Sequence, residues 1–137
     1  MTLDCGAGGN LSGEEVIKRY EEKVLRPIGR AVEYVTSNQV FHGVDQKSLP
    51  AHWEAWLETF MGGVGAAWYR AHMLAGSRLP MLLSTPSMRF AKMRQSYETD
   101  QVYIPVPDTA NDYARFDLRF DGMHCQLPVD RVDEQIC

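Results

Sequence analysis

Cysteine is scarce in this sequence, and neither sign of charge dominates it. The 137 residues include Cys5, Cys125 and Cys137 but no Cys-x-x-Cys pair, so neither a zinc knuckle nor a thioredoxin-type redox pair is supported. We expect free thiols in a reducing compartment. The 14 basic residues are mixed with 18 acidic ones, which gives no positive field for a phosphate backbone, so we expect no nucleic acid partner.

A long apolar run is also missing. Residues 60–83 form the most apolar region, but Arg70, His72 and Arg78 interrupt it, whereas a membrane span needs about 20 uninterrupted apolar residues. We therefore expect a soluble or peripheral protein. Residues 1–10 lack the arginines of a mitochondrial transit peptide and the apolar core of a secretory signal. A mitochondrial location would therefore need a removed presequence or an unconventional import signal.

Motifs for catalysis or cofactor binding are absent as well. The four histidines are scattered and show no metal-binding spacing such as His-Glu-x-x-His. The glycines within residues 6–9 lack the Lys and the Ser or Thr of a phosphate loop. His124 and Cys125 are adjacent, so on a strand they would point to opposite faces and form no dyad. We expect no metal, no cofactor and no catalytic activity of the chain's own.

The most informative stretch is Leu49–Leu57, which reads LPAHWEAWL. Pro50 suits the first turn of a helix, where backbone N–H groups have no internal partner. Four large apolar residues follow at i, i+3, i+4 and i+7: Trp53, Trp56, Leu57 and Phe60. This spacing is that of one helix face, and it predicts a helix that carries two tryptophans. The indoles are either core residues or a docking face, since tryptophan is enriched at binding hot spots.

These residues and those before them carry a resemblance to a known family. Arg30, Val32 and Tyr34 fit the pattern R-x-V-x-Y of a short strand pair. Phe41 then supplies an aromatic residue and Asp45 an acidic turn. The element (I/V/L)-P-x-x-W-x-x-W-(L/I) follows, with Pro50, Trp53, Trp56 and Leu57. In order and spacing the chain resembles the seventeen-kilodalton accessory subunit family of mitochondrial NADH:ubiquinone oxidoreductase, complex I, and its assembly-factor paralogue mimitin.

The resemblance implies a non-catalytic accessory subunit of the respiratory chain. Such a subunit would lie on the matrix side of the inner mitochondrial membrane, peripheral to it, and fasten other subunits together through aromatic anchors. An assembly factor that binds the same place transiently is the alternative within the family. The chain departs from the family ahead of Arg30, where a charged helix replaces the segment Gly-x-Asp-x-x-Gly-Asn-x-Tyr-Tyr-Glu, and this indicates a diverged member.

The first third of the chain predicts a helix and then a hairpin. Ser12–Glu15 has the form of a capping box, in which the Ser and Glu side chains satisfy free backbone N–H groups. A helix should follow to about Leu25. Ala31–Thr36 has the composition of a strand, which should turn at Ser37–Asn38 and return through Val40–Val44.

The later part predicts further helices, an extended arm and one clear strand. Residues 66–74 and 85–97 are compatible with helices. Tyr103–Asp108 should lie as an arm across a neighbouring surface, because two prolines prevent it from being an internal sheet strand. From Ala114 to Asp121 apolar and charged residues alternate, which predicts a strand with one buried face, and Asp121–Gly122 should turn it into a second strand.

Together these signals predict a small single-domain α+β protein. It should contain an N-terminal helix, a short β-hairpin, a Trp-bearing helix, and an extended arm with a late amphipathic strand pair. Its segments would be a flexible terminus at 1–11, the family-like hairpin and Trp helix at 30–61, and the arm at 98–113. The expected partner-binding residues are Tyr34, Phe41, Pro50, Trp53, Trp56, Leu57, Tyr103 and Ile104.

Two functional hypotheses from different classes follow. The first is the accessory subunit, whose partners would be other subunits of a large respiratory complex. The second is a free-standing small α+β enzyme or ligand-binding domain, with a pocket between the late strands and Trp68–Tyr69. The mass at which the native protein migrates separates them, because an accessory subunit migrates with a very large assembly.

Overall fold

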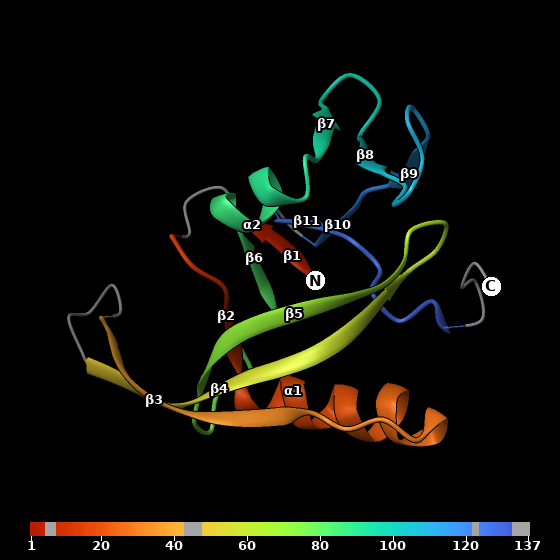
Figure 1. Cartoon of the computed structure of the whole chain (residues 1–137). Coiled ribbons are helices and arrows are strands. Elements are labelled where there is room, and N and C mark those ends of the chain that lie inside the picture. The colour runs from red at the N-terminus through yellow and green to blue at the C-terminus, as the bar shows by residue number, and fades with distance from the viewer. Residues whose placement is uncertain (5–7, 43–47, 122–123, 133–137) are drawn as a thin grey trace. The chain divides into compact units, whose positions relative to one another are not determined.

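A computed structural model describes residues 1–4, 8–42, 48–121 and 124–132, and it confirms the α+β class (Figure 1). The described helices are α1 (Glu14–Tyr20) and α2 (Thr85–Phe90). The strands are β1 (Thr2–Asp4), β2 (Leu11–Gly13), β3 (Glu33–His42), β4 (Ser48–Met61), β5 (Gly65–Leu74), β6 (Leu82–Ser84), β7 (Arg94–Ser96), β8 (Gln101–Pro105), β9 (Tyr113–Asp117), β10 (Arg119–Asp121) and β11 (His124–Gln126). None of the described helices is long and apolar enough to span a membrane.

The chain divides into two compact units, which are described separately below. Unit 1 consists of residues 1–9, 59–67 and 82–137, and unit 2 consists of residues 10–58 and 68–81. Unit 2 therefore comes from one nearly continuous stretch, whereas unit 1 combines both ends of the chain with the connection between β4 and β5.

The helix of unit 2 begins without the predicted capping box. Its N-cap is Gly13, no side chain caps the first turn, and the Ser12 hydroxyl instead lies 3.3 Å from the Gly13 carbonyl oxygen. Gly13 N–H donates to the Leu79 carbonyl over 2.8 Å, and a Cβ at this position would collide with the backbone of Ser77. The prediction is wrong because this close backbone approach pairs Gly13 with residues 77–79.

The predicted helix to about Leu25 is confirmed, although only its first half is regular. A π-helical turn, Glu21–Leu25, and a 3₁₀ turn, Arg26–Ile28, follow α1, and Gly29 ends them with φ of 72°. The Tyr20 hydroxyl donates to the Glu58 carbonyl on β4 over 3.0 Å. Figure 1 shows α1 and the turns after it running alongside β3 and β4, so the helix covers one face of these strands.

The strands of unit 2 lie in the order β2-β5-β4-β3. β2 pairs in parallel with β5, and β3 pairs antiparallel with β4. A hairpin exists here, but it is not the predicted one, because β3 runs through both predicted arms and pairs with β4 instead of folding back on itself. Ser37 and Asn38 form an irregularity between Thr36 and Gln39, and β3 continues to His42. The predicted return strand overlaps residues 43–47, which lie outside the described residues.

The predicted Trp helix is also wrong, because its residues form β4. Burial along β4 alternates from Glu54 to Glu58, with Ala55 and Leu57 buried between more exposed neighbours. The helix expected at residues 66–74 is likewise a strand, β5. These residues suit both structures locally, and the ladder partners β3 and β5 decide in favour of the strand.

The N-terminus of unit 1 is a strand rather than the flexible segment expected at 1–11. β1 lies between β11, to which it is antiparallel, and β6, to which it is parallel. The side chains of Thr2 and Leu3 are buried, and Leu127 N–H donates to the Met1 carbonyl over 2.8 Å. The correction applies to residues 1–4 and also to Leu11, which begins β2 and pairs with β5. Residues 5–7 lie outside the described residues.

Two later predictions for unit 1 hold in part. β10 and β11 pair antiparallel, as the turn signal at Asp121 indicated. The alternating strand is split at Leu118, whose N–H donates to the Asp100 carbonyl over 2.9 Å.

The helix predicted at residues 85–97 is shorter than expected. α2 begins at Thr85 with Ser84 as its N-cap. It ends at Phe90, well before Tyr97, because Arg94–Ser96 pairs with β8.

The extended arm is the last correction. β8 is the central strand of a three-stranded antiparallel sheet, in the order β7-β8-β9. Pro105 is tolerated because it is the final residue of the strand, opposite Tyr113, and the chain turns back where Val106 N–H donates to the Asp112 carbonyl over 2.9 Å. The arm therefore packs within its own unit.

Candidate functional site

One face of the strands in unit 2 is left uncovered by α1, and we call it the open face. Residues paired directly across two strands share a side of the sheet, so Glu33 joins Trp56, and Val35 joins Glu54. Alternate residues on β5 complete the set. The open face consists of Glu33, Val35, His52, Glu54, Trp56, Trp68, Arg70 and His72.

Three side chains at its centre hold one another in place. Trp56 Nε1 donates to Glu54 Oε1 over 2.9 Å, and Arg70 Nε lies 2.9 Å from the same oxygen. Arg70 Cζ also lies 5.1 Å from the centroid of the Trp56 ring. An ion pair, a cation–π contact and an indole hydrogen bond therefore act together, which keeps these rotamers fixed before any partner arrives.

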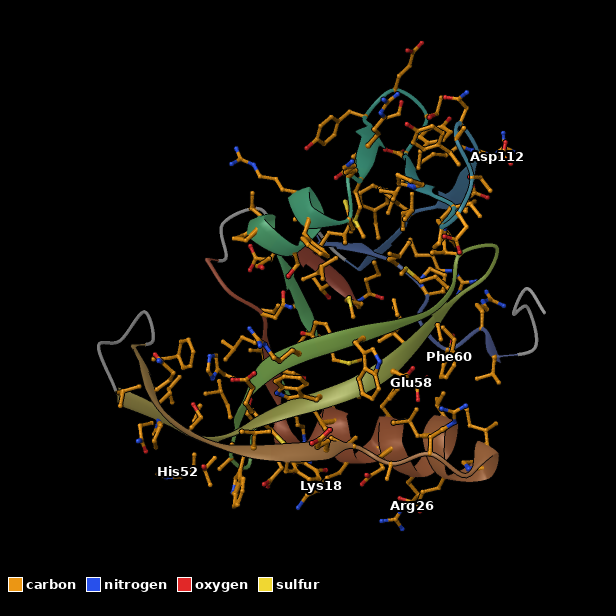
Figure 2. All side chains as sticks on the ribbon, viewed as in Figure 1. Lys18, Arg26, His52, Glu58, Phe60 and Asp112 are labelled. Carbon is orange, nitrogen blue, oxygen red and sulfur yellow. The ribbon has the colours of Figure 1, made fainter. Side chains whose placement is uncertain are left out.

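Trp68 lies beside this cluster on the same side of β5, because it stands two residues before Arg70. Its side chain is 65% exposed. A large aromatic residue on a sheet strand, rather than on a loop, presents a rigid apolar surface at small entropic cost. Val35 and His52 are also exposed, and Figure 2 labels His52. The open face thus combines the exposed indole of Trp68 with the paired charges of Glu54 and Arg70, and it also carries the exposed carboxylate of Glu33.

The irregularity in β3 shapes one end of the open face. Ser37 Oγ lies 3.1 Å from His72 Nδ1, and the rings of Phe41 and His72 are 5.5 Å apart at 53°. The residues mistaken for a turn therefore bring a hydroxyl to the histidine. Phe41, one of the predicted partner-binding residues, is half-buried against this ring.

Tyr34, another predicted partner-binding residue, points the other way. It pairs across the strands with the buried Ala55, so it faces the side covered by α1. Burial raises the pKa of its hydroxyl, and the carboxylates of Glu21 and Glu14 raise it further, while Arg26 opposes them. Its role is therefore structural, at the contact between helix and sheet.

The remaining predicted residues separate into three groups. Leu57 and Ile104 are 0% and 3% exposed, so they pack in the core and are withdrawn as docking residues. Trp53 is 44% exposed but lies on the opposite side of β4 from Trp56, because a spacing of three residues reverses the face of a strand. Pro50 is exposed near the start of β4.

Tyr103 belongs to unit 1, on the β7-β8-β9 sheet, whereas the open face is built from residues of unit 2. The sequence interpretation missed Arg70, and it named Trp68 only for the pocket of the alternative hypothesis. Their signal was present, since Trp68, Arg70 and His72 alternate with Tyr69, Ala71 and Met73 along β5. The helical interpretation of residues 66–74 concealed this alternation.

The described residues hold no group of three or more histidine, cysteine or acidic side chains placed to bind a metal ion. Cys125 is a free, partly exposed thiol, and Cys5 and Cys137 lie outside the described residues. Comparison with protein-family models, curated proteins and solved structures finds no match. The function must therefore be inferred from the geometry of the chain and from its sequence pattern.

Proposed function

We propose that the chain is a non-catalytic accessory subunit of mitochondrial complex I, and that it docks on a neighbouring subunit through the open face of unit 2. The observation that carries this proposal is Trp68, an indole that is 65% exposed beside a preorganised Glu54–Trp56–Arg70 cluster. Aromatic and arginine side chains on a rigid support are the residues most often found at the centre of protein interfaces.

The chemistry of the open face specifies the kind of surface that it fits. Glu54 and Arg70 neutralise each other, so the centre offers no net charge for attraction of a strongly charged partner. Covering Trp68 and Val35 would remove apolar surface from water without breaking this ion pair. The partner surface should therefore be apolar at its centre, with polar groups only at the rim.

The identity of the partner comes from the resemblance. The spacing of Pro50, Trp53 and Trp56 resembles that of the accessory subunit family, and on this basis we propose that the docking site lies on the peripheral arm, on the matrix side of the membrane. The support is the order of the residues and not a helix, since these residues form β4. An assembly factor of the same family remains the alternative, and it would leave the complex once assembly is complete.

The test is native electrophoresis of mitochondria from cells that express the tagged chain, with an in-gel stain for NADH dehydrogenase. We expect the chain to migrate with the stained complex, and Trp68→Ala to reduce this fraction while the protein stays folded. Phe90→Ala is the matched control, because Phe90 is an aromatic side chain on α2 that is 92% exposed and lies outside the open face.

Migration of the unmodified chain at its own mass would overturn the proposal. If Trp68→Ala and Phe90→Ala reduced the fraction that migrates with the complex equally, the open face would not be the docking surface. A pulse-chase experiment separates the two family roles, since a subunit stays in the mature complex and an assembly factor appears only in its intermediates.

A further inference from the structure

The three-stranded sheet of unit 1 carries a row of three polar side chains across its exposed face. Arg94 on β7 pairs with Tyr103 on β8, and Tyr103 pairs with Arg115 on β9. Directly paired residues share a face, so the row reads Arg-Tyr-Arg from strand to strand. The opposite face is apolar and buried, and it includes Val102 and Ile104.

A pocket of about 930 Å³ lies over this row and is open to solvent. This volume falls within the range of small-molecule sites, about 300 to 1,000 Å³. Its lining includes the row itself and residues around the loop between β8 and β9, where Figure 2 labels Asp112. The lining residues used below are Arg94, Tyr103, Asn111, Asp112, Tyr113 and Arg115.

Arg94 extends across the central strand. Its Cζ atom lies 5.0 Å from the centroid of the Tyr113 ring, and Tyr113 belongs to β9, two strands away from β7. The Cα atoms of Arg94 and Arg115 are separated by two strand spacings, about 9 to 10 Å. The cation–π contact therefore brings the Arg94 guanidinium toward the strand that carries Arg115.

Neither arginine forms an ion pair with a carboxylate in the described part of the chain, in contrast to Arg30, Arg70 and Arg78. Asp117 lies on the same face, two residues after Arg115 on β9. Gln101 Nε2 donates to Asp117 Oδ1 over 3.0 Å, while the Tyr103 hydroxyl donates to Gln101 Oε1 over 3.1 Å. This chain of hydrogen bonds fixes Tyr103 and leaves two positive charges available above it.

We propose that this pocket binds a small phosphorylated ligand that also carries hydroxyl groups, the class to which sugar phosphates belong. A phosphoryl group has a charge of about −1.5 to −2 at pH 7, which matches two guanidinium groups, and its oxygens accept the paired hydrogen bonds that arginine donates. Asn111 and Asp112 supply acceptors for hydroxyl groups at the rim. The Asp112 carboxylate would repel a bare anion, so we expect a ligand with hydroxyl groups to bind better than inorganic phosphate.

This site is independent of the open face, since the two lie in different units and share no residue. A failure of either proposal leaves the other unaffected.

Isothermal titration calorimetry with ribose 5-phosphate, inorganic phosphate and ribose tests the site. We expect one ribose 5-phosphate per chain, weaker binding of inorganic phosphate, no binding of ribose, and loss of affinity as salt is added. Arg94→Gln and Arg115→Gln should each weaken binding by roughly tenfold or more, because each removes a charge-assisted contact. Arg89→Gln is the control, since Arg89 is an exposed arginine on α2 outside the pocket.

Two further variants test the details. Arg115→Lys keeps the charge but loses the paired donors, so its affinity should lie between those of Arg115→Gln and the unmodified chain. Asp112→Asn should tighten binding of inorganic phosphate and reduce the preference for ribose 5-phosphate over it. Circular dichroism spectra that match the unmodified chain show that each variant is folded.

The proposal is overturned if ribose 5-phosphate gives no binding heat at millimolar concentration, or if Arg89→Gln weakens binding as much as the pocket variants. Tighter binding of a phosphoserine peptide than of ribose 5-phosphate would also overturn it, because the ligand would then be a protein segment.

Discussion

Two exposed sheet faces of this protein differ in whether their arginines form ion pairs. On the open face of unit 2, Arg70 is paired with Glu54 and stacked on Trp56. On the β7-β8-β9 sheet of unit 1, Arg94 and Arg115 have no carboxylate partner among the described residues. A neutralised arginine strengthens a surface that a partner covers, whereas unpaired arginines in a pocket are prepared for an anion.

The strands behind these faces also differ. β3, β4 and β5 contain 10, 14 and 10 residues, while β7, β8 and β9 contain 3, 5 and 5. Long strands covered by a helix provide a broad, stiff surface, which suits docking. Short strands joined by loops allow loop residues such as Asn111 to reach a small ligand.

The largest effect should come from removing the core beneath the open face. Leu57→Ala should lower the free energy of unfolding by about 2 to 5 kcal/mol, because Leu57 is fully buried. Tryptophan fluorescence during denaturation isolates this region, since Trp53, Trp56 and Trp68 all belong to unit 2. Val35→Ala, on the exposed side, should cost about 0.5 kcal/mol or less. Equal costs for the two would show that β4 has been assigned the wrong face.

A smaller loss is expected at the start of α1. Gly13→Ala should destabilise the protein by about 1 to 3 kcal/mol, because its Cβ would meet backbone atoms of Ser77 and Leu79, which cannot rotate away. Gly8→Ala is the matched control, since a Cβ there has open space around it. Chemical denaturation of both variants measures the difference. A stable Gly13→Ala variant would mean that the Gly13–Leu79 contact is looser than described.

Tyr34 of unit 2 should make the stability of the protein depend on pH at high pH. Its pKa is raised in the folded protein, first by burial and then by Glu21 and Glu14. A raised pKa gives a stability contribution that is complete below the unfolded pKa of about 10 and is lost as pH rises through the folded value. Stability should therefore fall above about pH 10, and Tyr34→Phe should lessen the fall. An unchanged pH profile in that variant would contradict the structural role of Tyr34.

The smallest effect concerns the ion pair of the open face. Glu54→Gln should cost on the order of 0.2 to 1 kcal/mol, because Arg70 is 64% exposed and water screens the interaction. A double-mutant cycle with Arg70→Gln at low and high salt isolates the pair, whose coupling should shrink as salt increases. A coupling that does not respond to salt would indicate that stacking on Trp56, and not charge, holds Arg70.

The parts of the fold that sequence predicted well are those with an unambiguous local pattern. The charges between Ala114 and Asp121 alternate with apolar residues, and two strands do form there. By contrast, Trp53, Trp56 and Leu57 fit a helix face as well as a strand. The small side chains of Ala51 and Ala55 mark the buried face of β4 too weakly to reveal the alternation, and only the neighbouring strands resolve the choice.

The candidate site in unit 1 could not have been found from local sequence. Arg94, Tyr103 and Arg115 belong to three separate strands, and they meet only because of the register that joins β7, β8 and β9. A shift of one residue in either pairing would move a member of the row to the buried face. The prolines near Tyr103 also led to the prediction of an extended arm, although Pro105 is only the last residue of β8.

The division of the chain also determines the order in which it can fold during synthesis. All the strands of unit 2 are present once residue 81 has left the ribosome, together with the segment 59–67 that belongs to unit 1. β1 precedes β11 by more than a hundred residues and cannot complete its antiparallel ladder until β11 emerges. Its parallel partner β6 emerges earlier, so only the edge of Thr2–Asp4 that faces β11 stays unpaired until residue 124 is made. Premature termination before that point would leave this edge exposed to chaperones and proteases.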